Sequence, residues 1–248
     1  MLFAILLLLL LNVHIITRHC CNHMINVLTI LLDLKIKEEE LPSFRGAVIA
    51  KAGTSNVLFH DHTDCGLRYS YPLIQYKRIG GYAAITSLES AIPRIGGLLL
   101  DNQEAFRLRI GRRLSLVSVA DVHRQSLELK VSERTAAYVI VRWLPLNQEN
   151  HKKYLAIDAL ADRITFLESL LVGNILSFAK GVDVFLDGTI SLSITDFIST
   201  QTCRFKGVDM LSFNLKFKTN VTLPEFIGLG KGVSLGFGVI NCMELNNK

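Results

Sequence analysis

From Met24 onward, strand and helix patterns follow one another in the order β-α-β-β-α-β, and this order limits the fold more narrowly than any other feature of the chain. Gly80 and Gly81 separate two of the strands and can take the positive φ angles of a tight hairpin. The order predicts a split-βαβ, ferredoxin-like module. The expected strands cover 24–37, 69–79, 82–87 and a long pair within 106–131, and the expected helices cover 44–52 and 88–99.

The second half of the chain starts with the same pattern. An apolar strand at 137–144 precedes the clearest helix, which ends in a basic turn and a glycine at Lys180 and Gly181. Its apolar residues recur at intervals of three and four, as one helix face requires: Leu160, Ile164, Leu167, Leu171, Ile175 and Phe178. Further strands are expected at 183–186, 190–197, 210–218 and 233–240, and no second helix is visible. We therefore predict an α+β chain of two tandem ferredoxin-like (RRM-like, split βαβ) domains, residues 24–130 and 131–248.

The first 23 residues carry an apolar run, Met1 to Leu11, that resembles the core of a secretion signal. No Lys or Arg precedes the run and no small-x-small cleavage site follows it, so a working signal is the less favoured interpretation. We expect residues 1–23 to be a non-native or disordered extension, whose deletion leaves the protein soluble and active. No run reaches the roughly 18 consecutive apolar residues of a membrane span, so no membrane is expected as a partner.

Composition and charge narrow the classes of function. Half of the 248 residues are apolar and a fifth are charged, which excludes a disordered chain. The formal net charge of +5 favours a polyanionic partner. The five cysteines form no C-x-x-C pair and their odd number leaves one unpaired, so a reducing, cytoplasmic location is expected.

The densest group of reactive side chains surrounds a His-x-His pair. If residues 58–62 are extended, His60 and His62 project to one face and Asp61 to the other. Imidazoles titrate near neutral pH and therefore suit proton transfer. The series through Cys65 also resembles the H-x-H-x-D-H signature of metallo-β-lactamase-type hydrolases, but only two histidines follow it, too few for that metal site. No metal ligand is therefore predicted, and a functionless surface pair remains an alternative.

Basic and aromatic side chains alternate directly after this pair. Arg68, Tyr69 and Tyr71 are followed by Tyr76 and Lys77 on the expected strand. Cations that meet phosphates and rings that stack on unpaired bases suit single-stranded RNA. The alternative is an ordinary strand whose charged side chains extend to solvent.

A glycine-rich segment lies near the end of the chain. Lys231 is followed by glycine where a phosphate-binding P-loop requires Ser or Thr, and the third glycine of a dinucleotide site is missing. What remains is a run of backbone amides that can approach phosphates closely, or alternatively a structural bulge. We expect substitution of Gly230 and Gly232 by valine to weaken RNA binding with little effect on thermal stability. The predicted RNA-binding residues here are Gly228, Gly230, Lys231, Gly232, Gly236 and Gly238.

Together these segments resemble a CRISPR-associated repeat-RNA endoribonuclease, the sixth-numbered Cas family of the RAMP superfamily. Residues 227–238 resemble the glycine-rich loop of that family, and residues 58–62, 68–77 and 143–150 resemble its subtype-B branch. The resemblance extends from about Met24 to Ile240, and the joint occurrence of the segments in order is more specific than any one of them.

The resemblance implies tandem ferredoxin-like domains and cleavage of precursor CRISPR RNA within each repeat, with no metal or cofactor. The ribose 2′-hydroxyl would attack the adjacent phosphate and leave a 2′,3′-cyclic phosphate. It further implies that His62 is the first candidate for the base and His60 the second, with Tyr69 as a donor to the phosphate or its leaving oxygen. Lys51 or Lys77 would offset the charge of the transition state, and Arg68 would join both in binding RNA.

The implied partner is CRISPR repeat RNA, with other effector-complex proteins and a second copy of the chain as further candidates. Asp61 stands between the two histidines where an amide is expected, and a nearby carboxylate raises the pKa of an imidazole. Two other functions remain open: a repeat-RNA-binding subunit with weak catalysis, and a metal-dependent hydrolase.

Overall fold

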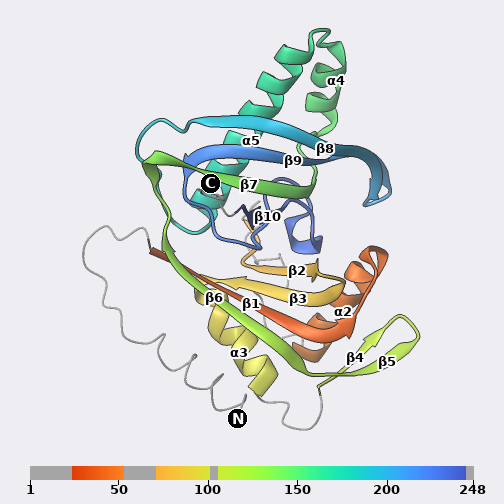
Figure 1. The fold of residues 1–248 in the computed structure, drawn as a ribbon. Helices are drawn as coiled ribbons and strands as arrows, with labels where there is room; N and C mark the ends of the chain where they lie inside the picture. The colour runs from red at the N-terminus through yellow and green to blue at the C-terminus, as the bar shows by residue number, and fades with distance from the viewer. Residues whose placement is uncertain (1–23, 53–70, 101–105, 244–248) are drawn as a thin grey trace, which may run out of the picture.

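The computed structural model describes residues 24–52, 71–100 and 106–243. These residues form two sheet-rich units, one stacked on the other (Figure 1). The α+β, tandem ferredoxin-like prediction is confirmed. The expected extension at residues 1–23 lies outside the described residues.

The first unit is a four-stranded antiparallel sheet with two helices on one face. Its strands lie in the order β2-β3-β1-β6, which is the ferredoxin-like order. The β2–β3 hairpin turns at Gly80 and Gly81, whose φ angles of +57° and +91° require glycine. The elements are β1 (Met24–Lys35), α2 (Leu41–Ala52), β2 (Ile74–Ile79), β3 (Tyr82–Leu88), α3 (Ile92–Leu100) and β6 (Val119–Glu128), with 3-10 turns η2 (Glu38–Glu40) and η4 (Glu89–Ala91).

A two-stranded hairpin, β4 (Phe106–Ile110) and β5 (Arg113–Val117), is inserted between α3 and β6. Leu108 and Ile110 of the hairpin are buried in the core of the first unit. Because side chains alternate along a strand, Arg107 and Arg109 face outward. The region 106–131, where two strands were expected, therefore forms three strands. The β4–β5 hairpin places two positively charged side chains on the surface.

The second unit repeats the topology without its second helix. Its strands lie in the order β10-β7-β9-β8, again antiparallel. Between β9 and β10 the described chain forms a loop with one 3-10 turn, η5 (Val233–Leu235), in place of a helix. The elements are β7 (Val131–Trp143), α4 (Gln148–Ala156), α5 (Leu160–Gly181), β8 (Leu192–Phe205), β9 (Val208–Val221) and β10 (Val239–Cys242).

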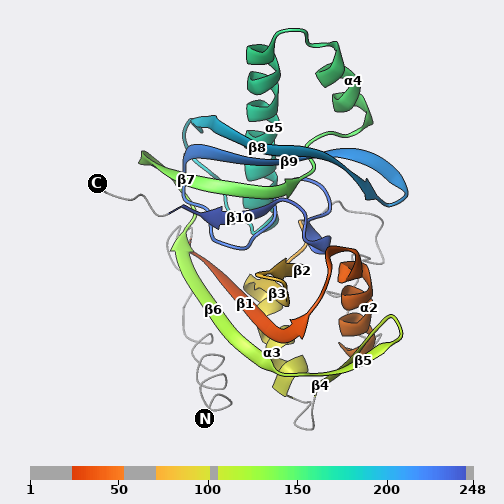
Figure 2. The same ribbon diagram turned by 45° about the vertical axis from the view of Figure 1, so that its right-hand side comes forward.

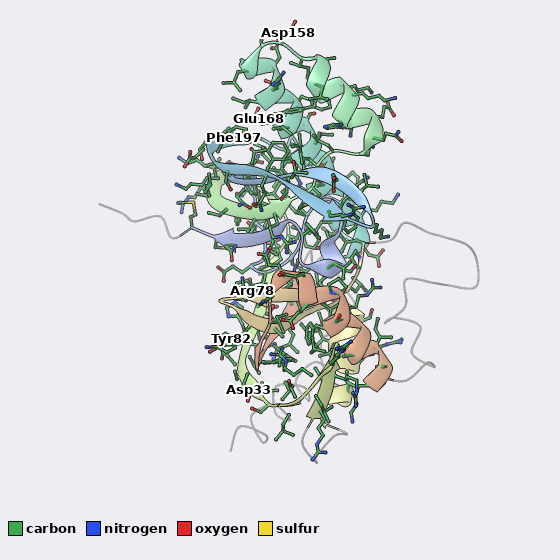
Figure 3. All side chains as sticks on the ribbon, turned by 90° about the vertical axis from the view of Figure 1, so that its right-hand side faces the viewer. Asp33, Arg78, Tyr82, Asp158, Glu168 and Phe197 are labelled. Atoms are coloured by element: carbon green, nitrogen blue, oxygen red, sulfur yellow. The ribbon has the colours of Figure 1, made fainter. Side chains whose placement is uncertain are left out.

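Helix α5 is the core helix that its apolar stripe predicts. Leu167, Leu171, Ile175 and Phe178 are buried against the sheet of the second unit. The helix begins beyond the sheet, where it forms an arm with α4 (Figure 2). By length and composition α5 could cross a membrane, but its C-terminal half belongs to the protein core. Asp158, between α4 and α5, marks the far end of the molecule from Asp33 (Figure 3).

Two local predictions for the second unit are wrong, and one helix, α4, was not predicted. Residues 183–186 form a turn and loop, because Val184 donates to the Ala179 carbonyl oxygen at 2.9 Å and Asp183 is left-handed, with a φ of +58°. Residues 233–235 belong to η5, so the last strand begins only at Val239. Helix α4 has no buried residue, so it lacks the apolar stripe that marks α5.

Candidate nucleic-acid interface

The predicted catalytic segment lies outside the described residues, since His60, His62, Arg68 and Tyr69 all fall within 53–70. Its two ends are described. Helix α2 ends at Ala52, and the chain resumes at Tyr71. The roles of the four residues therefore stay predictions.

Tyr71 fastens the second end to the seam between the units. Its hydroxyl donates to the Gly228 carbonyl oxygen at 2.7 Å, and its ring centroid lies 5.1 Å from that of Phe178. A Cβ atom at Gly181 would collide with the Tyr71 side chain, so glycine at the end of α5 permits the close approach. Burial raises the pKa of Tyr71 well above its ordinary value. Tyr71 is therefore a structural anchor that remains protonated at neutral pH.

The glycine-rich segment takes the place of the second helix of the second unit. Most of its predicted phosphate-binding amides donate to acceptors within the protein. The amides of Gly228, Lys231 and Gly238 donate to the Gln75 side chain and to the Leu144 and Arg142 carbonyl oxygens, at 3.0, 3.2 and 3.0 Å. In the described structure, the amides of Gly230 and Gly232 donate to no acceptor. The amides that could meet a phosphate are thus those of Gly230 and Gly232, beside the exposed Lys231 side chain.

The expectation that valine at Gly230 and Gly232 spares thermal stability is wrong. Both glycines have positive φ angles, +87° and +71°. A Cβ at Gly230 would lie 2.9 Å from Trp143 Nε1, and one at Gly232 would lie 2.7 Å from Phe237 Cδ2. A branched side chain would strain the backbone at both positions and displace buried aromatic rings.

Lys77 occupies the sheet face that the second unit covers. Neighbouring Tyr76 points to the opposite face, where its ring packs on Phe44 of α2. Lys77 has 0% exposure and its Nζ has no hydrogen-bond partner in the described structure. Its Cα lies 3.6 Å from the position that a Cβ at Gly236 would occupy, so the η5 loop packs on β2 at Lys77. Burial lowers its pKa to about 7.

The remaining predicted RNA-binding residue, Lys51, is exposed on the last turn of α2. It lines an open groove together with Arg107 and Arg109. The elements that carry these residues, α2 and the β4–β5 hairpin, lie side by side (Figures 1 and 2). Sequence reasoning missed these two arginines. The alternation of Arg107 and Arg109 with the apolar Leu108 and Ile110 could have identified them, because it places both arginines on one face of a strand.

Within the described ranges, no group of three or more His, Cys, Asp or Glu residues could hold a metal ion. His123 instead lies 3.7 Å from Glu225 and packs edge-on against the Phe226 ring, at the seam between the units. The series from His60 to Cys65 lies in the segment that is not described.

Comparisons with known proteins cover nearly the whole chain. The family model "Cas6b N-terminal domain" matches residues 23–128, and "Cas6b C-terminal domain" matches residues 130–243. Uncharacterized protein MJ0978 of Methanocaldococcus jannaschii is 30% identical over 118 residues, which are 47% of this chain and 79% of that protein.

Two solved structures that are named Cas6b, like the family models, share this architecture. The chain resembles a crystal structure of Cas6b with a TM-score of 0.76 and 25% identity, over 89% of this chain and 100% of that one. A crystal structure of the CRISPR RNA processing endoribonuclease Cas6b is similar in fold, with a TM-score of 0.68 and 23% identity. The match again covers 89% of this chain and 100% of that one. Because the two domain models match in order and together span residues 23–243 with a single-residue gap, the chain belongs to the Cas6b family.

Proposed function

We propose that this protein is an endoribonuclease that cleaves precursor CRISPR RNA within its repeats, without a metal ion, by attack of a ribose 2′-hydroxyl. Its membership of the Cas6b family carries the proposal, since a similar solved structure is named a CRISPR RNA processing endoribonuclease. The His60-x-His62 pair supplies the chemistry, because two imidazoles can remove and donate protons near neutral pH.

The proposed reaction is an internal displacement at phosphorus. His62 removes the 2′-proton while the 2′-oxygen attacks the adjacent phosphorus and the bond to the 5′-oxygen breaks. His60 or Tyr69 gives a proton to that leaving oxygen, so the products are a 2′,3′-cyclic phosphate and a free 5′-hydroxyl. Each proton transfer contributes roughly 10²–10⁴-fold.

The proposed RNA contacts combine fixed charge with accessible amides. Arg68, Lys51 and Lys231 meet phosphates, with Lys51 also offsetting the charge of the transition state. Among the predicted glycines, Gly230 and Gly232 have amides that donate to no other described residue. Lys77 could join them only if the segments that bury it moved, because its side chain has no exposure. A cytoplasmic location, other effector-complex proteins and a second copy of the chain belong to the same proposal.

The nature of the nucleophile is tested with RNA that carries one deoxyribose. A single 2′-deoxy substitution immediately 5′ of the cut phosphate should abolish cleavage while binding persists. Cleavage of the unmodified repeat should continue in excess EDTA. Cutting of the deoxy substrate, or activity that EDTA removes and a divalent ion restores, would contradict the proposal and favour the metal-dependent hydrolase.

The histidine assignment is tested by substitution. His62→Ala should slow single-turnover cleavage by about 10²-fold or more, because a general base is lost, with the RNA dissociation constant unchanged. His151→Ala, on α4, is the matched control and should cleave at the wild-type rate. A wild-type protein that binds repeat RNA but does not cut it would favour the alternative of a repeat-RNA-binding subunit.

A further inference from the structure

An open groove of about 500 Å³ runs between α2 and the β4–β5 hairpin. Both ribbon views place the hairpin beside the helix (Figures 1 and 2). Described residues line the groove on two sides. They are Ser43, Gly46, Ala47, Ala50 and Lys51 on the helix side, and Arg107, Arg109, Gly111 and Leu114 on the hairpin side.

The groove carries positive charge that no described residue neutralises. Lys51, Arg107 and Arg109 line it, and none of its described lining residues is a carboxylate. None of the three forms an ion pair with another described residue, whereas Arg113 of the same hairpin is paired with Glu40 at 3.7 Å. The buried Leu108 and Ile110 hold β4 so that both arginines face the groove. Such a surface is complementary to a chain of phosphates.

The shape of the groove suits unpaired nucleotides. The helix side presents small residues, Gly46, Ala47 and Ala50, so a flat ring can approach the helix. The opposite side presents Leu114, whose side chain is 54% exposed and offers an apolar contact. Single-strand sites combine cations for phosphates with planar groups on which bases stack, and the guanidinium planes of Arg107 and Arg109 can serve in both ways. The volume lies within the range of small-ligand sites.

The groove also extends along α2 to the end of that helix, which is close in sequence to the proposed catalytic histidines. It follows α2 as far as Lys51, and the helix ends at Ala52. His60 and His62 follow eight and ten residues later in the chain. We infer that this groove binds unpaired nucleotides of the repeat RNA next to the cut site, an inference that rests on the proposed function.

The first test fills the groove without disturbing the fold. A Cβ at Gly46 meets no atom within 4 Å, and glycine is a poor residue in a helix, so Gly46→Glu should fold well. The added carboxylate should weaken binding of the 2′-deoxy repeat RNA by at least about 10-fold, because it repels phosphates. Gly173→Glu on α5 changes the charge equally at another open helical glycine and should bind like wild type.

The second test removes the two arginines. Arg107→Gln with Arg109→Gln should weaken binding and reduce the magnitude of the negative slope of log K against log salt by about 1.4, since each phosphate contact on a single strand contributes about 0.7. Lys152→Gln on α4 should leave both the affinity and the slope unchanged. Thermal unfolding of each variant establishes that it is folded.

These binding measurements separate the inference from the proposed function. If the wild-type protein fails to cleave repeat RNA but the groove variants weaken binding, the proposed nuclease activity fails and the groove remains an RNA site. If the wild-type protein cleaves and both groove variants bind RNA as tightly as wild type, the groove assignment is overturned and an acidic protein partner becomes the better occupant.

Discussion

Lys77 places an amine at the seam between the two units, where water does not reach it. The side chain is completely buried and, within the described residues, its Nζ has no hydrogen-bond partner. Burial lowers its pKa from 10.5 to about 7 because the charged form loses its hydration. The neutral amine therefore predominates in the folded protein above about pH 7.

This shift makes stability depend on pH. Between the folded pKa of about 7 and the ordinary lysine value of 10.5, the unfolded chain holds one more proton than the folded one. The free energy of unfolding should therefore rise with pH across that window, by about 1 kcal/mol per pH unit from this group. Below pH 7 both states are protonated and this contribution becomes constant.

Lys77→Met should stabilise the protein at pH 7 and reduce the rise of stability between pH 7 and 9. Urea unfolding at pH 7, 8 and 9 measures both effects. Lys51→Met removes an exposed lysine and should retain the wild-type slope. Equal slopes for wild type and Lys77→Met would show that Lys77 does not titrate near pH 7.

At the scale of the element, glycine has opposite effects on stability in α2 and in the glycine-rich loop. Gly46 is exposed in a helix with open space around it. Gly238 has a φ of +64°, and a Cβ there would collide with the Leu229 carbonyl oxygen. The loop needs glycine for close backbone contact, whereas the helix loses stability through it.

Alanine at these two positions should move stability in opposite directions. Gly46→Ala should raise the free energy of unfolding by about 0.5–1 kcal/mol through helix propensity. Gly238→Ala should lower it by about 1–3 kcal/mol because it strains the loop backbone. Thermal melts should place the two variants on either side of wild type. A Gly238→Ala protein that melts with wild type would contradict the loop conformation.

For the whole molecule, the two units share part of their buried interior, although the helix-covered face of the first sheet has a core of its own. Ile25, Val27 and Leu88 of the first sheet pack in the same apolar cluster as the core of the second unit. Gln75, with 0% exposure, accepts from the Gly228 amide at 3.0 Å and donates to the Tyr71 hydroxyl at 2.9 Å. The units should therefore unfold as one cooperative body.

Calorimetry should show a single unfolding transition. Gln75→Leu leaves the buried Gly228 amide without an acceptor, which costs about 1–3 kcal/mol, so that transition should shift to lower temperature without dividing. Gln201→Leu, at an exposed position of β8, is the control and should melt near wild type. Two separately resolved transitions in the wild-type protein would contradict the shared interior.

Local periodicity in the sequence was enough to predict most elements. The stripe from Leu160 to Phe178 determines α5, because residues three and four apart share a helix face whatever packs against it. The glycines at 80 and 81 likewise determine the β2–β3 turn. Helix α4 has no such stripe and was missed. The proposed catalytic histidines rest on sequence alone, since residues 53–70 are not described.

The sequence by itself thus determined the tandem fold and the residues that alternate on each strand, since both follow from neighbours along the chain. It did not determine which alternating face is covered. Lys77 and Arg107 both lie on strands with basic side chains, yet one is buried and the other is exposed. The tertiary structure decided this, because the η5 loop that packs on β2 at Lys77 lies more than 150 residues further along the chain.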